Sequence, residues 1–147
     1  MKETGFNPLD SIIFLANRVG RLLANEVRHK SGLDDLGLQP QHMGILVDLW
    51  QRDGVRQQDL AVSTIKDKGT IARALNALER DDVLVRVPDP IDKRTKRIFL
   101  THRGRRLREQ LLPQARQVEA EALSGLKPEE LQACKHVLGH IYRKYHQ

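Results

Sequence analysis

The chain has one cysteine among 147 residues, Cys134, so a disulfide framework within the chain is excluded. So little cysteine is typical of a reducing compartment. The chain also has no apolar run near the ~20 residues that a membrane-spanning helix requires. Its opening, MKETGFNPLD, has an acidic residue and a proline where a secretory signal needs a basic patch and an apolar stretch. We therefore expect a cytoplasmic protein with no membrane partner.

The signatures of common enzyme classes are missing as well. There is no nucleophile elbow, no phosphate-binding glycine loop and no HExxH metal signature. His136 and His140 lie one helical turn apart, but a third and a fourth metal ligand are not evident nearby. We expect an exposed helix surface there, and predict no metal, no cofactor and no catalytic residue.

What the chain does contain is typical of a basic globular protein. Hydrophobic residues make up 39% and charged residues 30% of it, and its length fits one domain. The formal net charge is +6 and the pI is about 9.8, which suits a polyanionic partner. Many unrelated proteins are equally basic, so the positions of the charges have to decide.

Apolar residues at intervals of three and four predict an all-helical first half. A long amphipathic helix is expected over residues 9–29 and a second over 41–52, which Pro40 precedes. A third, short helix begins near Gln57 and extends to Ile65. Asp67 then has the position of an N-cap for a fourth helix, after a turn short enough for a helix-turn-helix.

Residues 67–101 join that fourth helix to two β-prone runs, 84–87 and 98–100. The segment PDPIDKRTKR between the runs cannot continue a regular strand, which predicts a hairpin with a long basic tip. Thr101 is the expected N-cap of a fifth helix, which extends to about Leu123 and is interrupted or kinked at Pro113. A last helix is expected from 127 to 145.

The fourth helix has two different faces. At about 100° per residue, one side is apolar and the other is polar. The apolar side consists of Ile71, Leu75 and Leu78, and the polar side of Gly69, Arg73, Asn76 and Arg80. Arg and Asn pair with guanine and adenine edges in the major groove of DNA. A helix of this kind followed by a basic hairpin describes a recognition helix and a β-wing, and so points to DNA.

The chain resembles the MarR family of winged helix-turn-helix transcription regulators, most strongly between Gln57 and Gly104. DKGTIARALNALE resembles the family's recognition helix, DPIDKRTKRIFLT its wing, and LTHRG the opening of its fifth helix. The resemblance implies a mainly α fold with a small β-wing, in a single domain over 1–147. It implies a DNA-binding lobe over 38–103, flanked by dimerisation helices over 9–30 and 104–147. It also implies a homodimer on a pseudo-palindromic operator and, by the family's common mode, ligand-responsive repression.

Six residues of the recognition helix are the candidates for its DNA contacts: Lys68, Gly69, Thr70, Arg73, Asn76 and Arg80. The first three lie at the helix N-terminus, where free N–H groups and the helix dipole favour phosphate. Arg73 and Asn76, one turn deeper, are candidates for base readout, and Arg80 for a phosphate contact. The alternative for each is a solvated helix face.

In the wing, the candidates are Asp92, Lys93, Arg94, Lys96 and Arg97, because a narrow minor groove attracts inserted basic side chains. By the resemblance, Asp92 would orient the Arg94 guanidinium while Lys93 or Arg94 enters the groove. The alternative is a solubilising loop.

Other features are assigned by the resemblance or by helical spacing. The family tends to bind small aromatic or phenolic effectors, for which Phe14, His42, Met43 and Trp50 are the candidate pocket residues, with ordinary core packing as the alternative. Cys134 falls on an apolar helical stripe, where we expect a buried thiol, with a redox sensor as the alternative. The family often has glycine after the recognition helix, where the chain needs a left-handed residue; Asp81 and Asp82 stand there instead. A winged-helix module that binds only proteins is the alternative function.

Overall fold

The computed structural model describes residues 5–32, 35, 37–39, 42–64 and 66–146. Pro40, Gln41 and Ile65, which the sequence analysis placed at a helix start and in the third helix, lie outside these residues. The described elements are, in chain order, η1 (Pro8–Asp10), α1 (Ile12–Ser31), α2 (Met43–Gln51), β1 (Val55–Arg56), α3 (Gln57–Ser63), α4 (Lys68–Arg80), β2 (Leu84–Pro88), β3 (Lys96–Leu100), α5 (His102–Ala122) and α6 (Pro128–Tyr145).

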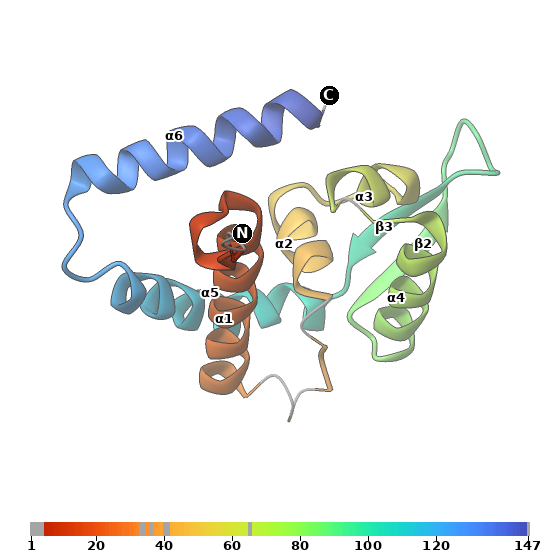
Figure 1. The fold of residues 1–147 in the computed structure, drawn as a ribbon. Helices are drawn as coiled ribbons and strands as arrows, with labels where there is room; N and C mark the ends of the chain where they lie inside the picture. The colour runs from red at the N-terminus through yellow and green to blue at the C-terminus, as the bar shows by residue number, and fades with distance from the viewer. Residues whose placement is uncertain (1–4, 33–34, 36, 40–41, 65, 147) are drawn as a thin grey trace.

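Helices α2 to α4 and a three-stranded antiparallel sheet form one lobe (Figure 1). The strand order is β1-β3-β2, with Leu84 opposite Leu100 and Val55 opposite Ile98. Strand β1 was not predicted, because two residues are too short to show an alternating pattern. The apolar face of α4 packs into the core of this lobe, as predicted. The fully buried side chains of this lobe's core are Ile45, Leu46, Leu49, Leu60, Ile71, Leu75, Leu78, Val83, Leu84 and Ile98.

Several helix boundaries differ from those expected. Helix α1 begins at Ile12, after the separate 3-10 turn η1 whose cap is Asn7. Helix α5 continues through Pro113, so of the two expected alternatives, an interruption or a kink, the interruption is wrong. The expected left-handed residue after α4 is Asp82, at φ 59°. Asp accepts this conformation better than most residues with a Cβ, because its short polar side chain bonds locally.

The long helices extend away from the lobe. In Figure 1 the wing projects at one end of the molecule and the connection between α5 and α6 lies at the opposite end. Helix α1 packs beside α5, where the Lys30 ammonium lies 2.6 Å from the Glu121 carboxylate. Neither α1 nor α6 buries a described side chain fully. Within the described chain, no helix is both long enough and apolar enough to cross a bilayer.

The first turn of α5 is fixed tightly to the lobe. The predicted cap is confirmed: the Thr101 hydroxyl accepts a hydrogen bond from the Gly104 N–H at 3.0 Å. The same hydroxyl donates to the Asp82 carbonyl at 2.6 Å and lies 3.0 Å from the Val83 carbonyl. The Trp50 indole donates to the Gly104 carbonyl at 3.0 Å. A Cβ on Gly104 would lie 2.1 Å from the Val83 oxygen. Glycine is therefore required for this close approach, which couples α5 to the sheet and to α2.

Candidate nucleic-acid interface

The N-terminus of α4 is held by its own cap. The Asp67 carboxylate accepts hydrogen bonds from the Thr70 N–H at 2.8 Å and from the Thr70 hydroxyl at 2.7 Å. These bonds, that of the Thr70 N–H above all, lower the pKa of Asp67. The N-cap prediction is confirmed, but Thr70, expected to meet phosphate, already uses its N–H and its hydroxyl proton within the turn. Lys68 and Gly69 are exposed beside it.

The polar face of α4 is open to solvent. Arg73, Asn76 and Arg80 are all exposed, as the helical spacing predicted. The Arg73 guanidinium donates to the Thr70 hydroxyl at 3.2 Å, so its side chain lies along the first turn of the helix. A positive group next to a helix N-terminus, on an exposed face, is suited to a ligand with regularly spaced negative charges.

Arg86, in the middle of β2, joins this face and was not among the predicted site residues. Its guanidinium donates to the Asn76 side-chain oxygen at 2.7 Å, and through Nε to Glu79 at 3.3 Å. Its backbone N–H donates to the same Glu79 carboxylate at 3.0 Å. Hydrogen bonds from Arg86 are also the main cause that lowers the pKa of Glu79. In the sequence, only its position as a charged residue between two valines could have indicated a role in the site. A solvent-facing position in a strand explains that pattern equally well.

The base of the wing is organised around Asp89, whose side chain is 1% exposed. Its carboxylate accepts from the backbone N–H groups of Ile91 at 2.8 Å and Asp92 at 3.1 Å, and from Arg97 Nε at 2.6 Å. These bonds, led by the Ile91 N–H, lower the pKa of Asp89 to about 2. Arg97 also donates to the Gly54 carbonyl at 3.0 Å, which ties the wing to the turn before β1.

This arrangement differs from the expected roles of two wing residues. The Asp92 carboxylate accepts from the Arg94 backbone N–H at 3.1 Å and from the Thr95 hydroxyl at 3.3 Å, instead of holding the Arg94 guanidinium. In the wing, an aspartate does hold a guanidinium, but the pair is Asp89 and Arg97. The reason is that Asp89 is buried at the base of the wing, whereas Asp92 is exposed at its tip. The side chains at the tip, including Lys93 and Arg94, are exposed.

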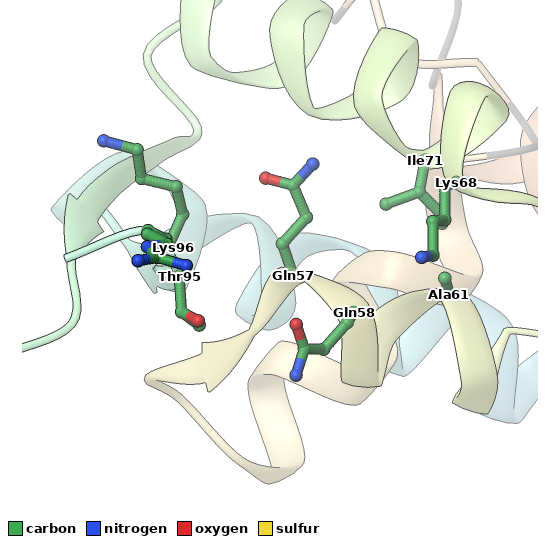
Figure 2. Close-up of a pocket in the computed structure, with 8 residues that line it drawn as sticks. Gln57, Gln58, Ala61, Lys68, Ile71, Thr95 and Lys96 are labelled. Atoms are coloured by element: carbon green, nitrogen blue, oxygen red, sulfur yellow. The ribbon is translucent and has the colours of Figure 1, made fainter. Parts of the chain in front are cut away.

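A notch of about 280 Å³ separates the wing from α3 and α4. Figure 2 shows Gln57 and Gln58 between Thr95 and Lys96 of the wing on one side and Lys68 of α4 on the other. Arg94 also lines the notch. The concave surface therefore brings three cations from two distant segments together with two amides. The sequence analysis did not assign the glutamines to the site, because their neighbours are set by the tertiary structure.

Comparisons with known proteins agree with this geometry. The MarR family model matches residues 38–96. YybA of Bacillus subtilis (strain 168), described as an uncharacterized HTH-type transcriptional regulator, is 31% identical over 110 residues, which is 75% of this chain and 73% of YybA. The chain belongs to the MarR family. It is thus a DNA-binding transcription regulator of the winged-helix type and not an enzyme.

Two solved structures extend the likeness of this MarR-family protein over the long helices. CouR from Rhodococcus jostii RHA1, bound to p-coumaroyl-CoA, is 26% identical, with a TM-score of 0.77 over 93% of this chain and 95% of that one. A putative MarR-family regulator from Listeria monocytogenes, complexed with 26mer DNA, has a TM-score of 0.83 over 91% of this chain and 88% of that one. Because its sequence identity to this chain is 21%, this structure supports the fold alone.

The four candidate effector residues of this MarR-family chain have separate surroundings. Phe14 stacks edge-on against Phe6, with ring centroids 5.4 Å apart. Met43 packs against the core of the lobe, and Trp50 is hydrogen bonded to α5. His42 is buried, and burial lowers its pKa. The packing alternative describes Met43 well, whereas Trp50 also lines a groove between α2 and α5.

The last helix carries two further outcomes. Cys134 is exposed in the single chain, so the expectation of a buried thiol is wrong for this fold, because α6 does not pack onto the lobe. His136 and His140 are also exposed, as expected for a helix surface. Among the described residues, no group of three or more His, Cys, Asp or Glu side chains is placed to hold a metal ion.

Proposed function

We propose that this MarR-family protein binds a specific pseudo-palindromic operator as a homodimer and represses transcription from it. The observation that carries the proposal is the exposed polar face of α4 beside the basic wing: Lys68, in the first turn of α4, lines the same notch as Arg94 and Lys96. A helix of this kind fits the major groove, and a basic hairpin beside it reaches the adjacent minor groove.

The residues divide between contact and support. Lys68 and Arg80 are assigned to phosphates, and Arg73 to base edges, because Arg73 is exposed one turn inside α4. Gly69 has no side chain, which allows the first turn of α4 to approach the DNA backbone closely. Lys93, Arg94 and Lys96 supply the positive charge of the wing. We assign Thr70, Asp92 and Arg97 to holding the helix cap and the wing in place, because their polar groups are used within the protein.

The exposed apolar surface of the long helices supports the homodimer. Large apolar side chains of α1 and α6 are left facing solvent in the single chain: Ile12, Ile13, Val19, Leu22, Val137, Leu138, Ile141 and Tyr145. A groove of about 800 Å³ lies between these helices and α3. Monomeric proteins rarely leave contiguous patches of this kind uncovered. A second copy related by two-fold symmetry covers them and places two α4 helices on successive half-sites.

Fluorescence anisotropy tests the DNA proposal directly. The purified protein is titrated onto its own upstream intergenic DNA and onto a scrambled duplex of equal length, across a salt series. We expect a preference of ~10³-fold or more for the upstream duplex at moderate salt. Equal binding to both would remove that duplex as the operator, and no binding even at low salt would favour the alternative, a winged-helix module that binds proteins. A promoter–reporter fusion, expected to rise when the protein is absent, tests repression.

The homodimer is tested on the same sample. Leu138→Glu places a charge on the exposed apolar face of α6, outside the DNA-binding lobe. Sedimentation should show the wild type as a dimer and the variant as a monomer, while circular dichroism of the variant stays helical. Operator affinity of the variant should fall, because one lobe contacts only one half-site. A wild-type monomer that binds the full operator would contradict the proposal.

We also propose a small aromatic effector that carries an acidic group. The groove between α2 and α5 has a volume of about 660 Å³, and its lining includes Trp50, three arginines and two acids: Arg105, Arg108, Arg116, Asp53 and Glu109. Asp53 is paired with Arg105 at 3.7 Å, so Arg108 and Arg116 are the arginines assigned to the ligand. An aromatic wall with guanidinium groups suits such a ligand, and the related CouR is bound to p-coumaroyl-CoA. Trp50 is the single tryptophan, so quenching of its fluorescence by p-coumaroyl-CoA, reduced in Arg108→Ala, tests the site. Unaltered fluorescence and DNA affinity would exclude this ligand.

A further inference from the structure

We propose that Arg86 determines part of the operator sequence without touching DNA, by fixing which side of the Asn76 amide faces the major groove. This inference rests on the proposed DNA binding and adds a residue that sets its sequence preference. Three contacts carry it: Arg86 to Asn76, Arg86 to Glu79 by its side chain, and Arg86 to Glu79 by its backbone.

The Glu79 carboxylate holds both the backbone and the side chain of Arg86 in place. Its backbone N–H and its Nε both donate to the same Glu79 carboxylate oxygen, at 3.0 and 3.3 Å, and Nη2 lies 3.4 Å from the other oxygen. The Arg86 side chain is 23% exposed, less than that of Glu79 at 40%. A guanidinium anchored at a carboxylate in this way loses most of its rotamer freedom, and Nη2 then reaches Asn76 at 2.7 Å.

The orientation of the Asn76 amide follows from donor and acceptor chemistry. A guanidinium has only donors, whereas an asparagine side chain has one acceptor oxygen and one NH₂ donor group. The oxygen must therefore face Arg86, because a flipped amide would set two donors against each other. This leaves the NH₂ group as the part of Asn76 that is directed away from β2, on the exposed face of α4.

A fixed amide changes the expected base preference. Asparagine recognises adenine with both of its groups, the oxygen accepting from N6 and the NH₂ donating to N7. With the oxygen engaged by Arg86, Asn76 presents a donor, which suits the keto oxygens of guanine O6 or thymine O4. Adenine also offers N7 to this donor, but the N6 amino group beside N7 is a second donor, whereas guanine has the acceptor O6 beside its N7. We therefore assign to Asn76 a guanine or thymine, in place of the adenine that asparagine otherwise favours.

The test is selection of binding sites from randomised duplexes, followed by competition measurements on single-position operator variants. Wild type, Asn76→Ala, Arg86→Met and Arg86→Lys are compared, each first shown by circular dichroism to be folded. Methionine keeps the length of the arginine side chain without its donors. Lysine keeps the charge beside Glu79, but one ammonium does not reproduce the planar fork that spans Glu79 and Asn76.

In the wild type, one operator position should prefer guanine or thymine over adenine by about tenfold. Asn76→Ala should remove the base preference at that position and leave the preferences at other positions unchanged. Both Arg86 variants should shift it toward adenine, because the amide is then free to turn, and Arg86→Lys should keep an overall affinity near that of the wild type. The other positions should be unchanged.

Two results would overturn the assignment while leaving the proposed function intact. One is an Arg86→Met protein that loses affinity uniformly for all duplexes with a smaller salt slope, which would make Arg86 a phosphate contact. The other is a base preference at the Asn76-dependent position that Arg86→Met and Arg86→Lys leave unaltered. A folded wild type that prefers no sequence at all would reject the proposed function and, with it, this assignment.

Discussion

Gly104→Ala is expected to destabilise the protein, although alanine is the better helix former. The new Cβ would lie 2.1 Å from the Val83 carbonyl oxygen and 3.0 Å from a methyl group of Leu100. The oxygen belongs to the backbone, so no side-chain rotation relieves the contact. The start of α5 has to move by about 1 Å or more, and overpacking of this kind costs roughly 1 to 3 kcal/mol.

That movement also strains hydrogen bonds on both sides of the glycine. The Val83 carbonyl accepts from the Thr101 N–H at 3.1 Å, and Trp50 donates to the Gly104 carbonyl at 3.0 Å. Each such bond contributes about 1 kcal/mol. The helical preference of alanine over glycine offsets about 1 kcal/mol. If about one of these bonds is lost, its cost and the helical preference cancel, and the net loss is about 1 to 3 kcal/mol of the free energy of unfolding.

Differential scanning fluorimetry at a fixed protein concentration measures the change. For a chain of this length, the loss corresponds to a Tm about 3 to 10 °C lower. Gly44→Ala is the matched control, since Gly44 lies in the first turn of α2 and its Cβ would meet only a Thr64 methyl group at an ordinary 3.7 Å. The control should keep or slightly raise the Tm. A Gly104→Ala protein as stable as the control would refute the close-approach argument.

Three further predictions concern the wing and the turn after α4. Arg94→Ala should weaken operator binding by ~1 to 3 kcal/mol and reduce the salt slope by about 1 in the anisotropy assay, whereas Arg52→Ala, at the end of α2, should do neither. Asp89 has its pKa lowered from 3.8 to about 2, so its contribution to stability is present above pH 3.8 and is lost as the pH falls toward 2. The Tm difference between wild type and Asp89→Asn should accordingly be large at pH 7 and narrow below pH 4; a constant difference would exclude this linkage. Asp82→Gly should stabilise the protein by up to ~1 kcal/mol and Asp82→Val should destabilise it by more, because φ at this position is 59°. Equal Tm values for the two variants would show that the turn is not constrained.

Local patterns were sufficient for much of the fold. The apolar spacing of Ile71, Leu75 and Leu78 identified the buried face of α4, and the caps at Asp67 and Thr101 were predicted from residue type and position. These features depend on neighbours within a few residues, so the sequence contains the whole cause. The prolines between the β-prone runs likewise marked the wing loop.

The residues that support the site were harder to predict. Arg86, Asp89 and Gln57 have few sequence features that separate them from other polar residues. Arg86 takes its role from Glu79, seven residues away, and Asp89 binds Arg97, eight residues away, besides the nearby N–H groups of Ile91 and Asp92. A side chain's role is set by which donors and acceptors surround it, and that depends on how the hairpin folds onto the lobe.

The sequence by itself determined the helix-turn-helix, the basic wing and the polar face of α4, because helical and β periodicity act over short distances. Only the tertiary structure decided that Asp89 instead of Asp92 holds a guanidinium, that Arg97 is held at the base of the wing, and that α1 and α6 leave their apolar faces uncovered. Those outcomes depend on the direction in which each side chain points after packing. Pairing between segments distant in the chain fixes that direction, and residue type alone does not.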